Sequence, residues 1–180
     1  MVFADDQLLI AQDYEDLEYM TRKLIEEYEL WGLKLNATKT KYMAIGDTSR
    51  DLKLEEGKGT ISHVSENIYL GIRKAKDRNY EPEINDRINK GRAAIQKLSS
   101  ILWDRDVTPK TKTHIYHAIV TSTITYAAET WCLKAKTIAK LNSTEMDFWR
   151  RSARISRKDK IRNTIINLLK PNDIYICSTA

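Results

Sequence analysis

The chain has 180 residues, a formal net charge of +5, and 42% hydrophobic against 31% charged residues. This balance is typical of a globular protein with one or two small domains and excludes an extended disordered chain. No apolar run reaches the roughly 18 residues of a membrane span. The acids close behind Met1 differ from the positive start of a signal peptide. We therefore expect an intracellular protein, nuclear or cytoplasmic, that is neither secreted nor membrane-bound.

The first ten residues contain two adjacent acids, Asp5 and Asp6, between short apolar segments at residues 2–4 and 8–10. This pattern predicts a tight β-hairpin with both acids at its tip. Adjacent acids repel each other unless a cation lies between them, and Mg²⁺ prefers such oxygen ligands. Two such ions can clamp the reacting oxygens of a phosphoryl transfer. The alternative is a solvated turn, because Asp favours turns through its own hydrogen bonds.

Helix and strand signals alternate over the next seventy residues. Asp13 can cap a helix that Gly32 ends, and the intervening apolar residues recur at three- and four-residue steps. These residues are Leu17, Met20, Leu24, Ile25, Tyr28 and Trp31. A strand is predicted at residues 42–45 and a further hairpin strand at 67–72. Between them, residues 46–59 are predicted to form a polar connection that contains a short strand-like stretch.

The remainder of the chain is predicted to be mostly helical. Residues 81–103 place apolar side chains on one face, and Thr108 followed by Pro109 opens another helix. Next, a helical period is predicted to continue through Ile115, Ile119, Ser122 and Tyr126. Residues 137–155 are predicted to carry on one side Ile138, Leu141, Phe148, Trp149, Ser152 and Ile155. Phe148 and Trp149 are predicted to be core residues rather than stacking platforms. His114, His117, Cys132 and Cys177 lack metal-ligand spacing, so we interpret the histidines as surface or packing residues and the cysteines as free thiols.

Charge is divided unevenly along the chain. Residues 1–70 carry 8 basic and 14 acidic side chains, whereas residues 71–170 carry 22 basic and 10 acidic ones. The basic side chains are densest at residues 150–162, where Asp159 is the single acid. These are Arg150, Arg151, Arg154, Arg157, Lys158, Lys160 and Arg162. Such a cluster predicts nucleic-acid binding without sequence preference, through counterion release. The alternatives are a solvated helical face and a nuclear localisation patch.

Several motifs occur in an order that resembles the reverse transcriptases of non-LTR, LINE-like retrotransposons, from Phe3 to about Leu169. The box Phe3-Ala4-Asp5-Asp6 resembles the aspartate pair of the palm. Gly32-Leu33-Lys34-Leu35-Asn36 with Lys39-Thr40 resembles the motif after its helix, and Tyr69-Leu70-Gly71 resembles the primer grip. Residues 126–131 and 150–163 resemble segments that follow the thumb. The resemblance implies an α+β fold, with a partial palm at residues 1–75 and a helical thumb with a basic post-thumb segment at 76–180.

The resemblance also implies roles for individual residues. Asp5 would bind Mg²⁺ directly and Asp6 would support it, while Lys39 would lie near the phosphates of the incoming deoxynucleotide. Tyr69, Leu70 and Gly71 would hold the primer end. The alternatives are a solvated lysine at position 39 and a buried strand edge at residues 69–71. The implied partners are an RNA template, a DNA primer and deoxynucleotides, and a palm edge left exposed would favour self-association.

The fingers and the earlier palm strand with its metal-binding aspartate have no counterpart in this sequence, so we expect little or no polymerase activity from the chain alone. The function predicted from the sequence is therefore a fragment of an RNA-directed DNA polymerase. One alternative is a non-catalytic nucleic-acid-binding remnant of a truncated element. A third hypothesis is an unrelated helical interaction protein.

Overall fold

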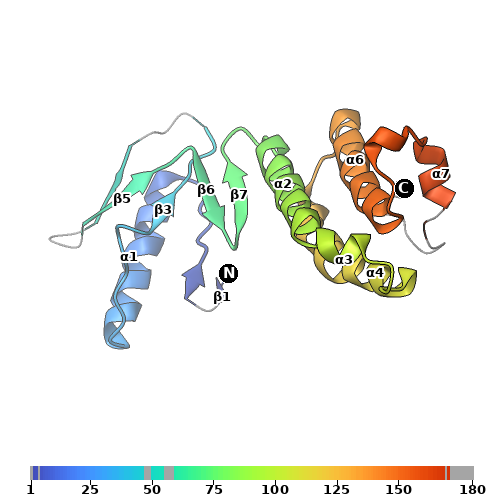
Figure 1. Ribbon diagram of the computed structural model, residues 1–180. Coiled ribbons are helices and arrows are strands. Elements are labelled where there is room, and N and C mark those ends of the chain that lie inside the picture. The colour runs from blue at the N-terminus through green and yellow to red at the C-terminus, as the bar shows by residue number, and fades with distance from the viewer. Residues whose placement is uncertain (1, 4, 47–49, 55–58, 169, 171–180) are drawn as a thin grey trace. The chain divides into compact units, whose positions relative to one another are not determined.

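The computed structural model describes residues 2–3, 5–46, 50–54, 59–168 and 170 of the chain, with only the backbone described at Val2 and Phe3. Ala4 and Cys177, which enter the sequence predictions above, lie outside the described residues. The fold is α+β, as predicted, with small sheets first and helices afterwards (Figure 1). The chain divides into two compact units, Met1–Asn79 and Tyr80–Ala180, called unit 1 and unit 2 below. Their identification as palm and thumb stays a prediction.

Unit 1 begins with a hairpin that differs in detail from the predicted one. Strand β1 (Val2–Phe3) pairs antiparallel with β2 (Asp6–Gln7), and Phe3 lies opposite Asp6. The short hairpin connection fixes this register. Asp5 is therefore in the turn, whereas Asp6 belongs to the second strand. The prediction that both acids lie at the tip and that residues 8–10 form the second strand is wrong.

Helix α1 (Tyr14–Leu30) has the caps that the sequence predicts. The Asp13 carboxylate accepts a hydrogen bond from the Asp16 amide at 2.8 Å. At the other end Gly32 has φ +70°, and the Leu33 amide donates to the Tyr28 carbonyl at 2.8 Å. This is a Schellman motif, whose left-handed residue is favourably glycine. Because the helix has already ended, Trp31 is 79% exposed and does not continue the apolar face as predicted.

The remaining strands of unit 1 form two small sheets. The order of the first is β3 (Lys41–Tyr42), β5 (Thr60–His63), β4 (Leu52–Lys53), with β3 parallel and β4 antiparallel to β5. The strand predicted at residues 42–45 is thus shorter, because pairing with β5 stops at Tyr42. The second sheet is the antiparallel hairpin of β6 (Glu66–Tyr69) and β7 (Ile72–Ala75).

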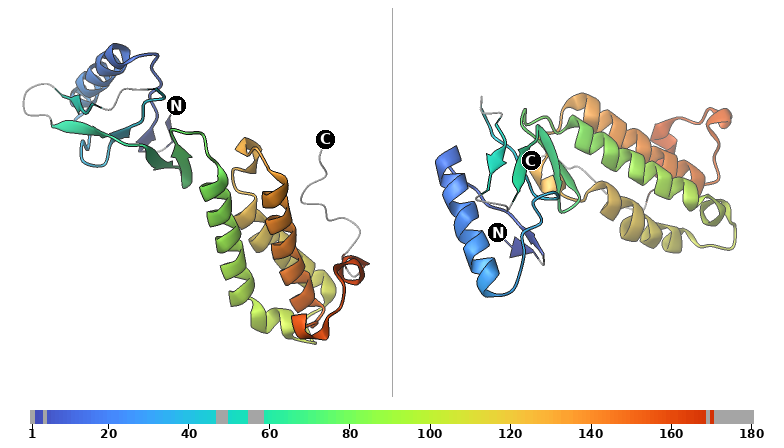
Figure 2. Two further views of the ribbon diagram at one scale, coloured as in Figure 1. Left: turned by 90° about the horizontal axis from the view of Figure 1, so that it is seen from above. Right: turned by 90° about the vertical axis from the view of Figure 1, so that its left-hand side faces the viewer.

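Unit 2 is helical. Its longest helices, α2 (Glu81–Lys97) and α6 (Ala135–Ser152), lie side by side (Figure 2). Between them are α3 (Ser99–Trp103), α4 (Pro109–Ile115), the π-helix η1 (Tyr116–Thr121), α5 (Ser122–Ile124) and the 3₁₀ turn η2 (Ala128–Thr130). The 3₁₀ turn η3 (Arg157–Asp159) and α7 (Asn163–Leu168) follow α6. The Thr108 cap is confirmed, because its hydroxyl accepts from the Thr111 amide. The helix predicted at 81–103 is broken at Leu98, where α3 begins in a new direction.

One continuous core holds unit 2 together. Its most buried members include Ile84, Ile88, Ile95, Leu102, Tyr116, Val120, Ile124, Phe148, Trp149 and Ile166. The core positions of Phe148 and Trp149 are confirmed, at 0% and 4% exposed. None of the helices among the described residues combines the length and apolar composition needed to cross a bilayer.

The core face of the middle segment is not the predicted one. Tyr116, Val120 and Ile124 are buried, whereas Ile119 and Tyr126 are 42% and 46% exposed. A π-helical turn holds more residues than an α-helical one, so Tyr116, Val120 and Ile124 stay in line at successive four-residue steps. The predicted set at Ile115, Ile119, Ser122 and Tyr126 starts one residue earlier and follows the mixed four- and three-residue steps of an ordinary α-helix, so it does not match the buried face.

Candidate nucleic-acid interface

The basic segment, residues 150–162, starts in the last turn of α6 and continues through η3 to the start of α7 (Figure 1). Arg154 and Lys160 adopt left-handed backbone conformations on either side of η3, with φ +59° and +55°. A capping box fixes η3, because the Ser156 amide donates to the Asp159 carboxylate at 2.6 Å. The single acid of the segment therefore stabilises the turn.

A buried lysine anchors the point where the segment leaves α6. The Lys112 ammonium donates to the carbonyls of Leu102, Asp104 and Ser152 at 2.7, 2.8 and 3.3 Å. A cation at the C-terminal ends of α3 and α6 is favourable because carbonyl groups there lack helical partners. Burial lowers the pKa of Lys112 from its ordinary value, and the Arg154 guanidinium lowers this pKa further.

Three of the seven predicted basic residues have internal partners. Arg150 donates to the Ile161 carbonyl at 2.5 Å and to the Asn163 side-chain oxygen at 2.8 Å. Arg151 donates to Asp147 at 3.1 Å and to Ser99 at 2.9 Å. Arg157 contacts Asp147 at 3.4 Å, but its side chain is 75% exposed. Arg150 and Arg151 therefore hold the fold together, in addition to any role toward a ligand.

The other four basic residues are exposed: Arg154, Lys158, Lys160 and Arg162. None of them forms an ion pair within the part of the chain that the structure describes. Exposed cations without carboxylate partners are the groups that can exchange their counterions for phosphates. The sequence predicts one set of seven, whereas the structure separates four surface cations from three with internal contacts.

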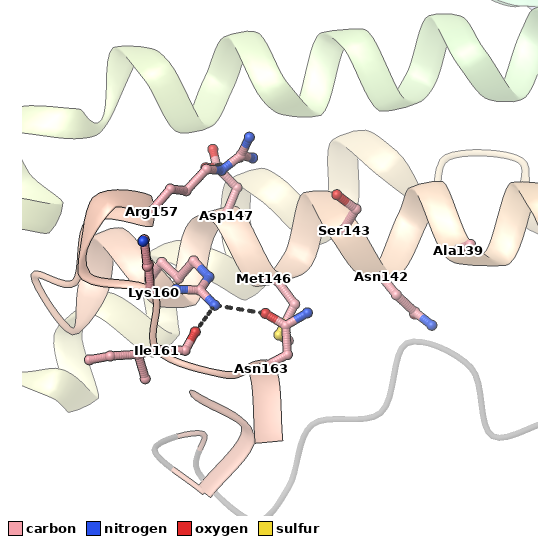
Figure 3. A pocket seen from close by; sticks show the side chains of 10 residues that line it. Ala139, Asn142, Ser143, Met146, Asp147, Arg157, Lys160, Ile161 and Asn163 are labelled. Carbon is pink, nitrogen blue, oxygen red and sulfur yellow. Dashed lines mark hydrogen bonds and ion pairs between the residues drawn. The ribbon is translucent and has the colours of Figure 1, made fainter. Parts of the chain in front are cut away.

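A pocket lies beside the basic segment (Figure 3). The sequence analysis did not predict it. It is open to solvent and has a volume of about 580 Å³. It is lined by Ala139, Asn142, Ser143, Met146, Asp147, Arg150, Arg157, Lys160, Ile161 and Asn163. The α6 residues among them recur at three- and four-residue steps, so they share one helix face. The small and polar residues Ala139, Asn142 and Ser143 at this spacing, opposite the apolar face of the helix, were the available signal. We call this feature the α6 pocket.

Unit 1 holds the residues that the family resemblance singles out for catalysis. Asp5 and Asp6 are exposed on the β1–β2 hairpin. Lys39 is exposed in a turn, and its amide donates to the Asn36 side-chain oxygen at 3.1 Å. Nowhere in the described ranges do three His, Cys, Asp or Glu side chains lie close enough to hold a metal ion. The roles of Asp5, Asp6 and Lys39 stay predictions.

Tyr69, Leu70 and Gly71 lie at the β6–β7 hairpin. Leu70 and Gly71 have φ +50° and +74° between the paired residues Tyr69 and Ile72, as in a type I′ turn. A Cβ at Gly71 would meet nothing within 4 Å. Glycine is therefore suited to this position by its conformation. The role of the hairpin as a primer grip stays a prediction.

The histidines that the sequence analysis interpreted as surface or packing residues and the described cysteine lie at the surface. His114 and His117 are exposed, as is the free thiol of Cys132. The fold and these features define an α+β chain whose helical unit presents a basic segment and a polar pocket.

Comparison with known proteins relates this chain to transposons. It is similar to a Caenorhabditis elegans protein whose name describes it as uncharacterized and transposon-derived. The two sequences are 28% identical over 152 residues, which are 83% of this chain and 54% of the relative. The chain therefore spans about half the length of that relative. No model of a known protein family matches the chain, and no solved structure matches it.

Proposed function

We propose that the chain derives from a transposable element and that unit 2 binds nucleic acid through the basic segment. The observation that carries this proposal is the set of four exposed cations at Arg154, Lys158, Lys160 and Arg162, none of which forms an ion pair with another described residue. Lys158 lies in the turn η3, which the Ser156–Asp159 capping box fixes, and Arg154 and Lys160 flank this turn. The bond of Arg150 to the Ile161 carbonyl holds the chain between Lys160 and Arg162. The similarity to a transposon-derived protein supports the proposed origin.

The overall charge of the two units favours the same assignment. Unit 2 carries 18 basic and 10 acidic residues, whereas unit 1 carries 12 basic and 15 acidic ones. Phosphate contacts supply affinity by releasing counterions, and this affinity falls steeply as salt rises. Unit 2 therefore has the charge needed for nucleic-acid binding that is not sequence-specific.

The test is the salt dependence of binding to a fluorescent oligonucleotide. Arg154, Lys158 and Arg162 are replaced together by Gln, and anisotropy is followed between about 50 and 200 mM salt. Because each lost phosphate contact lowers the slope of log K against log salt by about one, we expect the slope to fall by about two to three.

The matched control replaces three exposed cations of unit 2 outside the basic segment, Lys97, Arg105 and Lys110, by Gln. It has the same net charge as the test variant and is expected to keep most of the slope. Equal losses in both variants would show that only the net charge of unit 2 matters. A flat salt dependence of the unmodified chain would instead favour the unrelated helical interaction protein.

We further propose that the transposable element is a non-LTR retrotransposon and that the chain is part of its RNA-directed DNA polymerase. The order of the Asp5–Asp6, Lys39 and Tyr69–Gly71 motifs supports this proposal. In it, an RNA template, a DNA primer and deoxynucleotides are the partners and Mg²⁺ is the cofactor. The non-catalytic remnant of a truncated element is the alternative.

Asp5→Asn separates these two functions. It removes one carboxylate charge and keeps the size of the side chain. If the chain extends a primer with Mg²⁺, the variant is expected to lose extension and to bind the oligonucleotide unchanged. Asp13→Asn is the control, because Asn also caps helices. Absence of primer extension in the unmodified chain is expected both of an incomplete polymerase and of a non-catalytic remnant, so extension that Asp5→Asn abolishes is the result that would exclude the remnant.

A further inference from the structure

The α6 pocket combines a suitable size with walls from two segments. Its volume of about 580 Å³ lies in the range of small-molecule and cofactor sites. One wall is a face of α6, and the other is formed by residues 157–163, which fold back toward that face (Figure 3). The pocket is open to solvent, so one residue or nucleotide of a longer polymer can enter it while the rest of the polymer stays outside.

The charges that line the pocket favour an anion. Arg150, Arg157 and Lys160 are its cations, and Asp147 is its acid. The Asp147 carboxylate is already paired with Arg151 at 3.1 Å and lies 3.4 Å from Arg157. Lys160 has no ion-pair partner among the described residues, and the exposed Arg157 side chain can turn toward a ligand. A phosphate at this end of the pocket would meet two accessible cations.

Neutral polar groups line the rest of the pocket. Arg150 can only donate hydrogen bonds, so the Asn163 oxygen faces it and the Asn163 amide nitrogen is left as a donor. Asn142 and Ser143 lie on the α6 wall, and Met146 and Ile161 add apolar surface (Figure 3). Amide groups can form paired hydrogen bonds with the edge of a base.

We propose that the α6 pocket takes one nucleotide of a single-stranded nucleic acid. Its phosphate would lie at Lys160 and Arg157, with its base between the amides of Asn142 and Asn163 and the apolar surface of Met146. A base that is paired in a duplex cannot enter a pocket, whereas unpaired bases are free to turn outward. This inference rests on the proposed nucleic-acid binding and adds a preferred form of nucleic acid and a set of residues that contact it.

The test compares pairs of matched variants of the full chain. Lys160→Ala removes a pocket cation, and Lys158→Ala removes an exposed cation two residues away that does not line the pocket. Asn142→Ala removes a pocket amide, and Asn167→Ala removes an exposed amide outside it. The probes are a fluorescent oligo(dT) of about 12 nucleotides and a duplex of the same length. Thermal unfolding of each variant checks that it is folded.

The expected results distinguish binding in the pocket from binding through the overall positive charge of unit 2. Lys160→Ala should weaken oligo(dT) binding about tenfold and Asn142→Ala about fivefold, against about twofold for Lys158→Ala and no change for Asn167→Ala. Asn142→Ala should leave the salt slope unchanged because it removes no charge. The duplex should bind more weakly than oligo(dT) and respond equally to Lys158→Ala and Lys160→Ala.

Two results would overturn this inference while the proposed function stands. The first is equal weakening by Lys158→Ala and Lys160→Ala with no effect of Asn142→Ala. The second is equal affinity for the duplex and for oligo(dT). If the unmodified chain binds neither probe, both the inference and the proposed function fail.

Discussion

Unit 1 and unit 2 differ in how they bury apolar side chains. In the described part of unit 1 the buried hydrophobic residues are Ile25, Leu52 and Ile61, whereas unit 2 has a continuous core cluster of twelve. Large apolar side chains of unit 1 are instead exposed, including Ile10 at 78%, Leu30 at 77% and Ile45 at 69%. Burial of apolar surface is the main stabilising term in folding. Unit 2 thus has the packing to hold a binding surface in place, whereas the described part of unit 1 buries few apolar side chains.

This difference predicts that amide hydrogens of unit 1 exchange faster than those in the core helices of unit 2, because regions with few buried contacts open more readily. Self-association through the exposed apolar residues of unit 1 stays a prediction. Sedimentation of the full chain at several concentrations measures whether it self-associates.

The largest expected effect is that of Phe148→Ala in the core of unit 2. Phe148 is fully buried and its ring lies 4.8 Å from that of Tyr116, so the substitution leaves a cavity. We expect a loss of about 3–5 kcal/mol in the free energy of unfolding of unit 2. Chemical denaturation measures this loss, and hydrogen exchange followed separately in unit 1 and unit 2 shows which unit is destabilised. Ile25→Ala is the counterpart in unit 1, and faster exchange of unit 2 in that variant would contradict separate cores.

Lys112→Met tests whether the buried ammonium holds the helix ends of unit 2. The substitution keeps most of the side-chain length but leaves three carbonyls without their donor. We expect a loss of about 2–3 kcal/mol in the free energy of unfolding, because unsatisfied buried polar groups are costly. Lys110→Met, at an exposed position on the same helix, should stay within about 0.5 kcal/mol. Equal effects of the two substitutions would show that the hydrogen bonds of Lys112 contribute nothing to the free energy of unfolding.

Gly91→Ala tests the close approach of α2 and α5. A Cβ at Gly91 would lie 2.4 Å from Cγ1 of Ile124, which is 2% exposed and has little room to move. Helix propensity favours Ala by about 1 kcal/mol, but overpacking costs about 1–3 kcal/mol. We expect net destabilisation in thermal unfolding.

The same thermal-unfolding experiment on a double variant identifies the clashing partner. In an Ile124→Ala background the clash is absent, so Gly91→Ala is expected to be neutral or stabilising there. Destabilisation of the same size in both backgrounds would contradict the contact.

The smallest effect concerns Tyr116. Its hydroxyl is buried and forms no hydrogen bond within the described residues, although Thr121 lies near it without ordinary hydrogen-bond geometry. Tyr116→Phe removes an unsatisfied polar group, so we expect the free energy of unfolding at neutral pH to be unchanged or to rise by up to about 1 kcal/mol. Tyr126→Phe, at an exposed ring, is the control for thermal unfolding of both variants.

The same substitution predicts a change at alkaline pH. Burial raises the pKa of Tyr116 above its ordinary value, and the Glu145 carboxylate adds to the shift. The folded state therefore holds the tyrosine proton more tightly than the unfolded state. The resulting stability is complete below about pH 10 and is lost as pH rises toward the folded-state pKa. Tyr116→Phe should reduce this alkaline loss, and an identical pH profile in both proteins would contradict it.

The sequence by itself determined the features that depend on neighbouring residues. The Asp13 cap, the end of α1 at Gly32 and the Thr108 cap before Pro109 are where the sequence predicts them. Each depends on one side chain and the backbone within about one turn. The amphipathic pattern of residues 81–103 likewise predicted one apolar helix face, and Ile84, Ile88 and Ile95, which share that face by helical periodicity, are core residues.

Tertiary structure decided the features that depend on distant segments. The π-helical turn changed which residues near Tyr116 face the core, and three carbonyls from two other parts of the chain surround Lys112. Sequence composition treats the seven cations of the basic segment alike, but Arg150 and Arg151 find partners at Ile161, Asn163, Asp147 and Ser99. The α6 pocket exists only because residues 157–163 fold back toward α6. Local propensity does not determine which distant groups meet, because that is fixed by packing of the whole unit.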